Sequence, residues 1–107
     1  MPPVTHNTPT AEIDLTLEEQ WVVHVALLEY VEAVMQPESQ ASPPALELDL
    51  LGKIEAGDFV FSTFELGRLL QECNYYAQSA HIPSDDRPPI HRVIEKIDRL
   101  LTTVLQQ

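Results

Sequence analysis

The chain has 107 residues, with 17 acidic side chains against 6 basic ones and a formal net charge of -11. This length suits one domain with one hydrophobic core. The negative charge argues against binding to nucleic acids or anionic membranes, because both require a cationic face. The only cysteine, Cys73, excludes an intrachain disulfide and is expected to be a small buried hydrophobic residue on a helix.

The cellular setting is indicated by charge and by the N-terminus. The N-terminus lacks the positive charge and the apolar run of a signal peptide, and the longest apolar segment is interrupted by charged residues. We therefore expect a cytoplasmic protein. An excess of carboxylates with only two lysines, Lys53 and Lys96, is typical of proteins that stay soluble in molar salt. The alternative is that the acidic surface is a binding face for a partner.

The chain divides into a tail and a helical domain. Residues 1–14 are rich in proline and threonine and have almost no periodic apolar residues, which predicts a disordered N-terminal tail. Residues 15–107 are predicted to form a single all-α domain, a small bundle of about four helices. Residues 36–44 are rich in proline and serine and form a connection that lets the chain reverse.

The central helix is predicted over residues 17–36, where a capping box of Thr16 and Glu19 begins it and Pro37 ends it. A helix that is apolar over most of its circumference must be covered on more than one side. It therefore either lies inside a bundle or shares a face with a second copy of the chain. At about 100° per residue, one side of this helix carries Leu17, Trp21, Leu28, Val31 and Met35.

His24 projects into the middle of that apolar arc, about one turn from Trp21 and Leu28. One interpretation is a pH-sensitive or ligand-contacting histidine. The favoured interpretation is a neutral histidine in the core or at an interface, hydrogen-bonded to a backbone or side-chain acceptor.

Two further helices are predicted in the middle of the chain. A short one follows Ser42, its expected cap, and ends at Gly57, which suits a C-cap with positive φ. An extended segment over residues 59–61 then leads to a second capping box, Ser62 with Glu65. The third helix is predicted over about residues 63–80, with its apolar side formed by Leu66, Leu69, Leu70, Cys73, Tyr76 and Ala77.

Tyr75 points away from that apolar side and lies beside Arg68, Gln71 and Glu72 on the polar side of the third helix. An ordinary surface tyrosine is one interpretation of Tyr75. The other is an anchor for a protein partner, a role in which tyrosine and arginine are enriched.

The last helix, predicted over about residues 88–105, has the clearest pattern. Its apolar residues recur at alternating spacings of four and three, as in a coiled-coil seam. Such a seam packs either inside a bundle or across a dimer axis. The residues of the seam are Ile90, Ile94, Ile97, Leu101 and Val104.

The residue patterns of the common catalytic sites are absent from this sequence. The three glycines stand apart, so no phosphate loop is predicted. Metal-ligand residue types gather only around the loop before the last helix, in a spacing that matches no defined site, and Asp85 or Asp86 can instead cap that helix. We expect no catalytic, cofactor-binding or metal site. The residues with metal-ligand types are His81, Asp85, Asp86 and His91.

Three stretches resemble small uncharacterised acidic proteins of halophilic archaea. They are EEQWVVHVALLEYVE (18–32), IEAGDFVFSTFELGRLL (54–70) and VIEKIDRL (93–100). The resemblance extends over most of residues 15–101. It implies a salt-rich cytoplasm and carries no activity and no site residues over to this chain.

The sequence therefore favours a non-enzymatic interaction protein that self-associates or serves as a small adaptor or regulatory subunit. Its partner is expected to be a protein or a second copy of the chain. One alternative is a transcriptional regulator with a helix-turn-helix or winged-helix core that contacts DNA through Arg68. Another is a small-molecule-binding protein or enzyme with a pocket near His24. The candidate interaction residues are Trp21, His24, Leu28, Arg68 and Tyr75.

Overall fold

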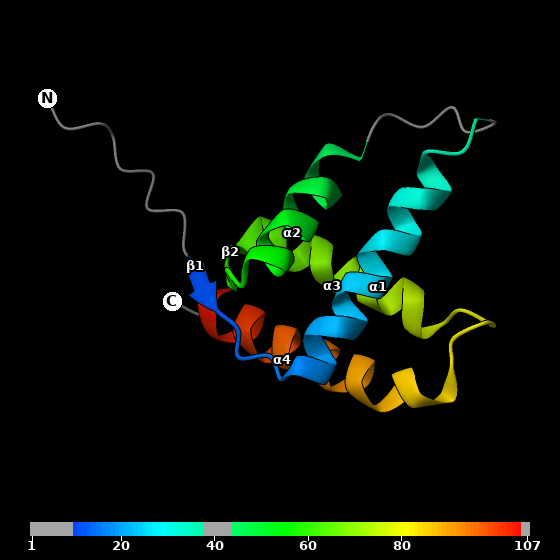
Figure 1. Ribbon diagram of the computed structural model, residues 1–107. Helices are drawn as coiled ribbons and strands as arrows, with labels where there is room; N and C mark the ends of the chain where they lie inside the picture. Colours follow the sequence, from blue (N-terminus) through cyan, green and yellow to red (C-terminus); the bar gives the residue numbers. More distant parts are fainter. Residues whose placement is uncertain (1–9, 38–43, 106–107) are drawn as a thin grey trace, which may run out of the picture.

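The computed structural model describes residues 10–37 and 44–105, and helices make up most of this part (Figure 1). The elements confirm the predicted single, mostly helical domain of four α-helices and add a small two-stranded sheet. In chain order they are β1 (Thr10–Glu12), α1 (Leu17–Val34), α2 (Ala45–Ala56), β2 (Val60–Ser62), α3 (Thr63–Ala77), the 3-10 turn η1 (Ser84–Asp86) and α4 (Arg87–Leu105).

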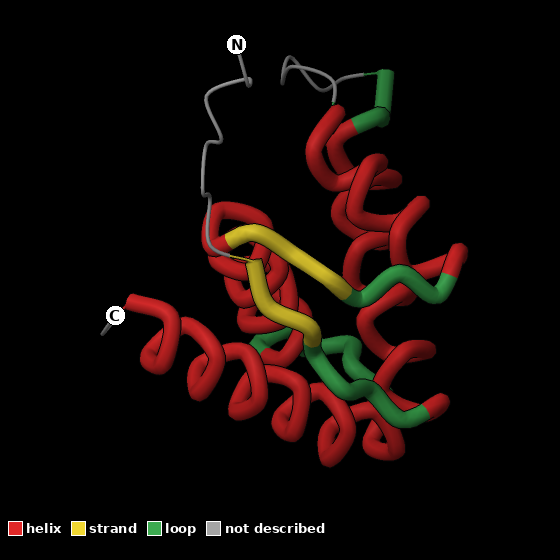
Figure 2. Tube along the Cα trace, turned by 90° about the vertical axis from the view of Figure 1, so that its left-hand side faces the viewer, coloured by secondary structure: helices red, strands yellow, loops and turns green. Residues whose placement is uncertain are grey.

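The four helices form two pairs. α1 and α2 run side by side in opposite directions, and α3 and α4 form a second such pair that crosses the first (Figure 1). Figure 2 shows the two short strands side by side next to the helices. None of the described helices is long and apolar enough to cross a membrane.

Three predicted helix ends are confirmed: the capping boxes that begin α1 and α3, and the glycine that ends α2. The Thr16 hydroxyl accepts a hydrogen bond from the Glu19 backbone N–H, and the Glu19 carboxylate accepts one from the Thr16 N–H at 3.0 Å. Ser62 and Glu65 form the same reciprocal pair at the start of α3. Gly57 ends α2 with φ of 74°, a left-handed conformation that costs glycine little.

Some predicted helix boundaries need correction. α1 ends at Val34 rather than at residue 36, and α3 ends at Ala77 rather than at residue 80. The difference in α1 is within the one or two residues by which helix ends commonly vary. α3 ends earlier because its C-cap is Gln78. The prediction of Ser42 as the cap of α2 is wrong, because α2 begins at Ala45 and its N-cap is Pro44, which makes no side-chain cap hydrogen bond. Ser42 itself lies outside the described residues.

The N-terminal segment contributes to the fold. β1 pairs antiparallel with β2, with Thr10 opposite Ser62 and Glu12 opposite Val60, and Ile13 and Leu15 that follow are buried in the core. The prediction of a disordered tail is therefore wrong for residues 10–14, because this stretch completes the sheet and fills the core. Residues 1–9 lie outside the described residues.

The core lies between the two helix pairs. The seam predicted in the last helix packs inside the bundle, where Ile90 and Ile97 are buried and Ile94 is partly buried. The interior also receives apolar side chains from every other helix and from β2. Its largest fully buried apolar residues include Phe61, Leu27, Leu50, Leu66, Ile90 and Ile97.

Candidate interaction surface

An apolar stripe runs along the solvent side of α1 and its C-cap. Leu17 is 82% exposed, Trp21 67%, Leu28 39% and Met35 63%. Steps of four, seven and seven residues place them on one side of a helix with 3.6 residues per turn. His24 lies between Trp21 and Leu28 on the same side. We call these five residues the α1 stripe.

The opposite side of α1 faces the core. Val22, Val23, Ala26 and Leu27 are at most 3% exposed, and α2 packs along one flank of the helix. The helix is thus apolar on two faces, and the other described elements cover only one of them. The sequence placed Val31 on the same side as the stripe, but Val31 is buried at the edge of the core.

His24 connects the α1 stripe to α2. Its ring stacks against Trp21 with the ring centroids 6.2 Å apart, and its Nε2 atom lies 2.9 Å from Glu55 Oε2 of α2. His24 is half-buried, with the side-chain hydrogen-bond partner that the favoured interpretation required. A hollow of about 220 Å³ opens here and is lined by Leu17, Gln20, Trp21, His24, Ile54 and Glu55.

Acidic side chains border the α1 stripe. α1 contains four glutamates and neither lysine nor arginine. Glu29 and Glu32 are exposed on the flank away from α2, and Glu55 stands on the α2 side. Glu18 also reaches the surface, where it forms an ion pair with Arg92 of α4. The uncovered apolar face therefore lies in a negative electrostatic field.

Two further predicted interaction residues lie elsewhere. Arg68 belongs to α3, and its guanidinium donates to the carboxylate of Glu47 at 2.8 Å, so Arg68 holds α3 to α2. Tyr75, also on α3, is exposed as predicted. The structure thus brings Trp21, His24 and Leu28 together in one surface and leaves the α3 pair outside it.

A buried carboxyl pair lies beside Arg68. Glu47 and Glu72 are each 2% exposed, so the prediction that Glu72 belongs to the polar side of α3 is wrong. Burial, together with the hydrogen bond and the negative charge from Glu47, raises the pKa of Glu72 to about 7. Burial also acts to raise the pKa of Glu47, but hydrogen bonds from Glu72 and Arg68 outweigh it and lower that pKa. Glu72 is therefore expected to stay protonated below about pH 7 and to share that proton with Glu47.

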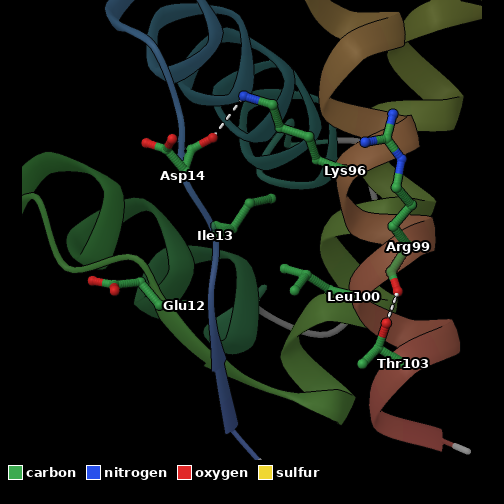
Figure 3. Close-up of a pocket in the computed structure, with 7 residues that line it drawn as sticks. All are labelled: Glu12, Ile13, Asp14, Lys96, Arg99, Leu100 and Thr103. Carbon is green, nitrogen blue, oxygen red and sulfur yellow. Dashed lines mark hydrogen bonds between the residues drawn. The ribbon is translucent and has the colours of Figure 1, made fainter.

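A larger hollow of about 310 Å³ lies between the N-terminal segment and α4 (Figure 3). The Lys96 ammonium at its edge is engaged by the backbone carbonyl of Asp14 and by Glu19, whereas the exposed Arg99 pairs only loosely with Glu95, at 3.4 Å. The sequence missed this hollow because it assigned one of its walls to a disordered tail. Its lining is Glu12, Ile13, Asp14, Lys96, Arg99, Leu100 and Thr103.

The cysteine and the acidic residues of the loop before α4 show no sign of a reactive site. Cys73 is buried as predicted, and burial raises the pKa of its thiol to about 12. Asp86 accepts a hydrogen bond from the Tyr76 hydroxyl at 2.7 Å. Within residues 10–37 and 44–105, no group of three or more histidines, cysteines or acids is arranged to hold a metal ion.

The fold and this surface define a small, mostly helical domain with one uncovered apolar helix face. Residues 13–98 match the model of a family of unknown function, DUF7853, and the chain belongs to this family. No curated protein and no solved structure matches the chain.

Proposed function

We propose that this protein is a non-enzymatic helical interaction module, a small adaptor or regulatory subunit, that docks onto another protein through the α1 stripe. The observation that carries this proposal is the exposure of Leu17, Trp21 and Met35 on a helix whose opposite face builds the core. Apolar patches with a polar border mark interaction sites. Tryptophan is among the residues that contribute most to binding at such sites.

Covering the α1 stripe is energetically favourable. Each square ångström of apolar surface removed from water contributes about 25 cal/mol, and no described element of the chain covers this face. The hollow beside His24 offers a seat for one apolar side chain of the partner. A helical adaptor needs no catalytic group, which fits the absence of a recognisable catalytic pattern in the sequence.

The alternatives have less support. A DNA-binding role depends on Arg68, and that guanidinium is held by Glu47. Self-association remains an alternative occupant of the α1 stripe, although the seam of α4 that favoured it is used inside the domain, as the burial of Ile90 and Ile97 indicates.

The test is recovery of the partner with a tagged protein in molar KCl. The wild type is expected to retain one stoichiometric partner, and Leu28→Ala is expected to lose it because this change removes the middle of the stripe. Phe64→Ala is the control, since Phe64 is an exposed apolar side chain on α3, outside the stripe. The proposal fails if the partner survives Leu28→Ala or if both variants release it equally.

We further propose that the module works in the salt-rich cytoplasm of a halophilic archaeon. This proposal is supported by the excess of acidic residues and by the ion pairs that the few basic side chains form. Lys53 pairs with Glu65, and Lys96 and Arg92 pair with Glu19. Among the described residues, most surface carboxylates form no ion pair with a basic side chain.

This setting predicts a salt-dependent fold. Raising KCl from tens of millimolar to molar is expected to increase the melting temperature by about 5–10 °C, because salt screens repulsion among the surface carboxylates. Thermal unfolding followed by circular dichroism measures the change. A melting temperature that is insensitive to KCl would remove the basis for salt adaptation.

A further inference from the structure

The charge around the α1 stripe points to one kind of partner. We propose that the stripe receives a cationic amphipathic helix of another protein, an inference that rests on the proposed function and names the chemistry of its partner. The helix would lay apolar side chains along Leu17, Trp21, Leu28 and Met35 and place lysines or arginines over the glutamates at both edges.

The shape of the surface suits a helix. The stripe follows α1 from its first residue to its C-cap, so a parallel or antiparallel helix can contact it over its whole length. Leu48 of α2 is also exposed, and it lies two turns from Glu55 on one side of α2. Because Glu55 contacts His24, this side of α2 adjoins the stripe and widens it.

The flanks of the stripe determine the charge of the partner. Glu29 and Glu32 are exposed on one flank and Glu55 on the other, and α1 offers no cation to neutralise them. In paired helices, the residues that flank the apolar seam select partners by charge. Lysines or arginines in the flanking positions of the partner would complement both edges.

A second copy of the chain suits this surface poorly. In a two-fold symmetric contact the same patch meets itself. An antiparallel α1–α1 pair sets like flank beside like flank, and a parallel pair sets the flank of Glu29 and Glu32 beside the flank of Glu55. In either arrangement the flank that carries Glu29 and Glu32 would face an acidic flank of the second copy. Such juxtaposition of like charges disfavours the contact, most strongly at low salt where the charges are not screened.

Synthetic helices of about 18 residues, matching five turns, provide the probes. One has leucines at heptad positions and lysines at the flanks, a second has glutamates in place of the lysines, and a third has the lysine peptide's composition in scrambled order. Trp21 is the only tryptophan of the chain, so its emission reports coverage of the stripe. The titrations use the lowest KCl concentration that keeps the protein folded.

The lysine helix is expected to shift Trp21 emission to shorter wavelength with a saturable curve, and the other two peptides are not. Glu29→Gln with Glu32→Gln should weaken this binding about tenfold. Glu95→Gln with Asp98→Asn is the matched control, because it removes two exposed charges from α4, and it should change the affinity less than about twofold.

Equal affinity for the lysine and glutamate helices would overturn the inference, as would equal weakening by the two double variants. A blue shift that grows with protein concentration without peptide, together with a doubled mass, would also overturn it and assign the stripe to a second copy. If a Leu28-dependent partner is nevertheless recovered, only the cationic helix is wrong. If no such partner exists either, the proposed function falls as well.

Discussion

Replacing Glu19 with glutamine is expected to lower the free energy of unfolding by about 3 kcal/mol at neutral pH. Glu19 is 1% exposed, and its carboxylate accepts hydrogen bonds from the Arg92 guanidinium at 2.9 Å, the Lys96 ammonium and the Thr16 backbone N–H. These contacts join the N-terminus of α1 to α4. Glutamine keeps the shape but removes the charge that two cations require.

The same substitution should change the pH dependence of stability. Burial alone would raise the pKa of Glu19, but hydrogen bonds from Lys96, Thr16 and Arg92 outweigh it and lower the pKa below the usual 4.5. A lowered folded-state pKa gives stability that is fully present above about pH 4.5 and is lost as pH falls through the folded value. The Glu19→Gln variant lacks this contribution, so its loss of stability below pH 4.5 should be smaller.

Chemical denaturation of the wild type and Glu19→Gln between pH 3 and 8 measures both effects. Glu18→Gln is the matched control, because Glu18 also pairs with Arg92 but is mostly exposed, and it should cost less than about 1 kcal/mol. If both variants lower the free energy of unfolding by the same small amount, Glu19 does not stabilise this end of α1.

Glu72→Gln is expected to stabilise the protein by about 3 kcal/mol above pH 7. Glu72 has a pKa raised by burial and by Glu47, to about 7 from the usual 4.5. Its Oε2 atom is buried without a hydrogen-bond partner among the described residues, which a carboxyl group tolerates better when it is protonated. A glutamine amide can donate a hydrogen bond to Glu47 at every pH and never carries the buried charge.

The sign follows from linkage. Between pH 4.5 and 7 the unfolded chain has released the Glu72 proton while the folded chain still holds it, so this group's contribution to stability falls as pH rises through that window. Below pH 4.5 both states are protonated, and the contribution is fully present. The stability difference between Glu72→Gln and the wild type should therefore grow from pH 4.5 to 7 and then level off.

Glu32→Gln is the matched control for Glu72→Gln. It removes the same charge from an exposed position of α1, so it reports the general benefit of reducing net negative charge. Denaturant titrations across pH 4–9 distinguish the two substitutions. If the pH profiles of Glu72→Gln and Glu32→Gln coincide, the buried carboxyl pair does not hold a shared proton.

Local patterns predicted the helices well because their signals lie within a few residues of one another. Thr16 with Glu19, Ser62 with Glu65, and Gly57 each act through contacts inside one turn. The helical spacing of the apolar residues then predicted the extent of each helix between these ends. The strand at Thr10–Glu12 was missed because its three residues are stabilised by β2, about fifty residues later in the chain.

The burial of Glu19, Glu47 and Glu72 could not be predicted from local sequence. Glu19 and Glu72 have polar neighbours in the sequence that suggest a surface position, whereas Glu47 lies between two leucines. Each of the three meets a cation or carboxyl group from a distant part of the chain in the structure. Because the chain has 17 acidic residues, its composition cannot distinguish these three buried glutamates from the exposed acidic residues.

The candidate surface was predicted in part. The apolar arc of the central helix predicts Trp21, His24 and Leu28, and these three residues lie together on the surface of α1. The sequence could not show which of two apolar faces is left uncovered, because α1 offers similar apolar character toward the core and toward solvent. That choice depends on how α2, α3 and α4 pack around it.

Acrylamide quenching of the Trp21 fluorescence tests the docking surface most directly. In the isolated protein the indole is mostly exposed, so strong quenching is expected. In the complex recovered through the wild-type protein, the quenching constant should fall severalfold because the partner covers the α1 stripe. Unchanged quenching in a stoichiometric complex would show that the partner binds elsewhere and would contradict the proposed role of this face.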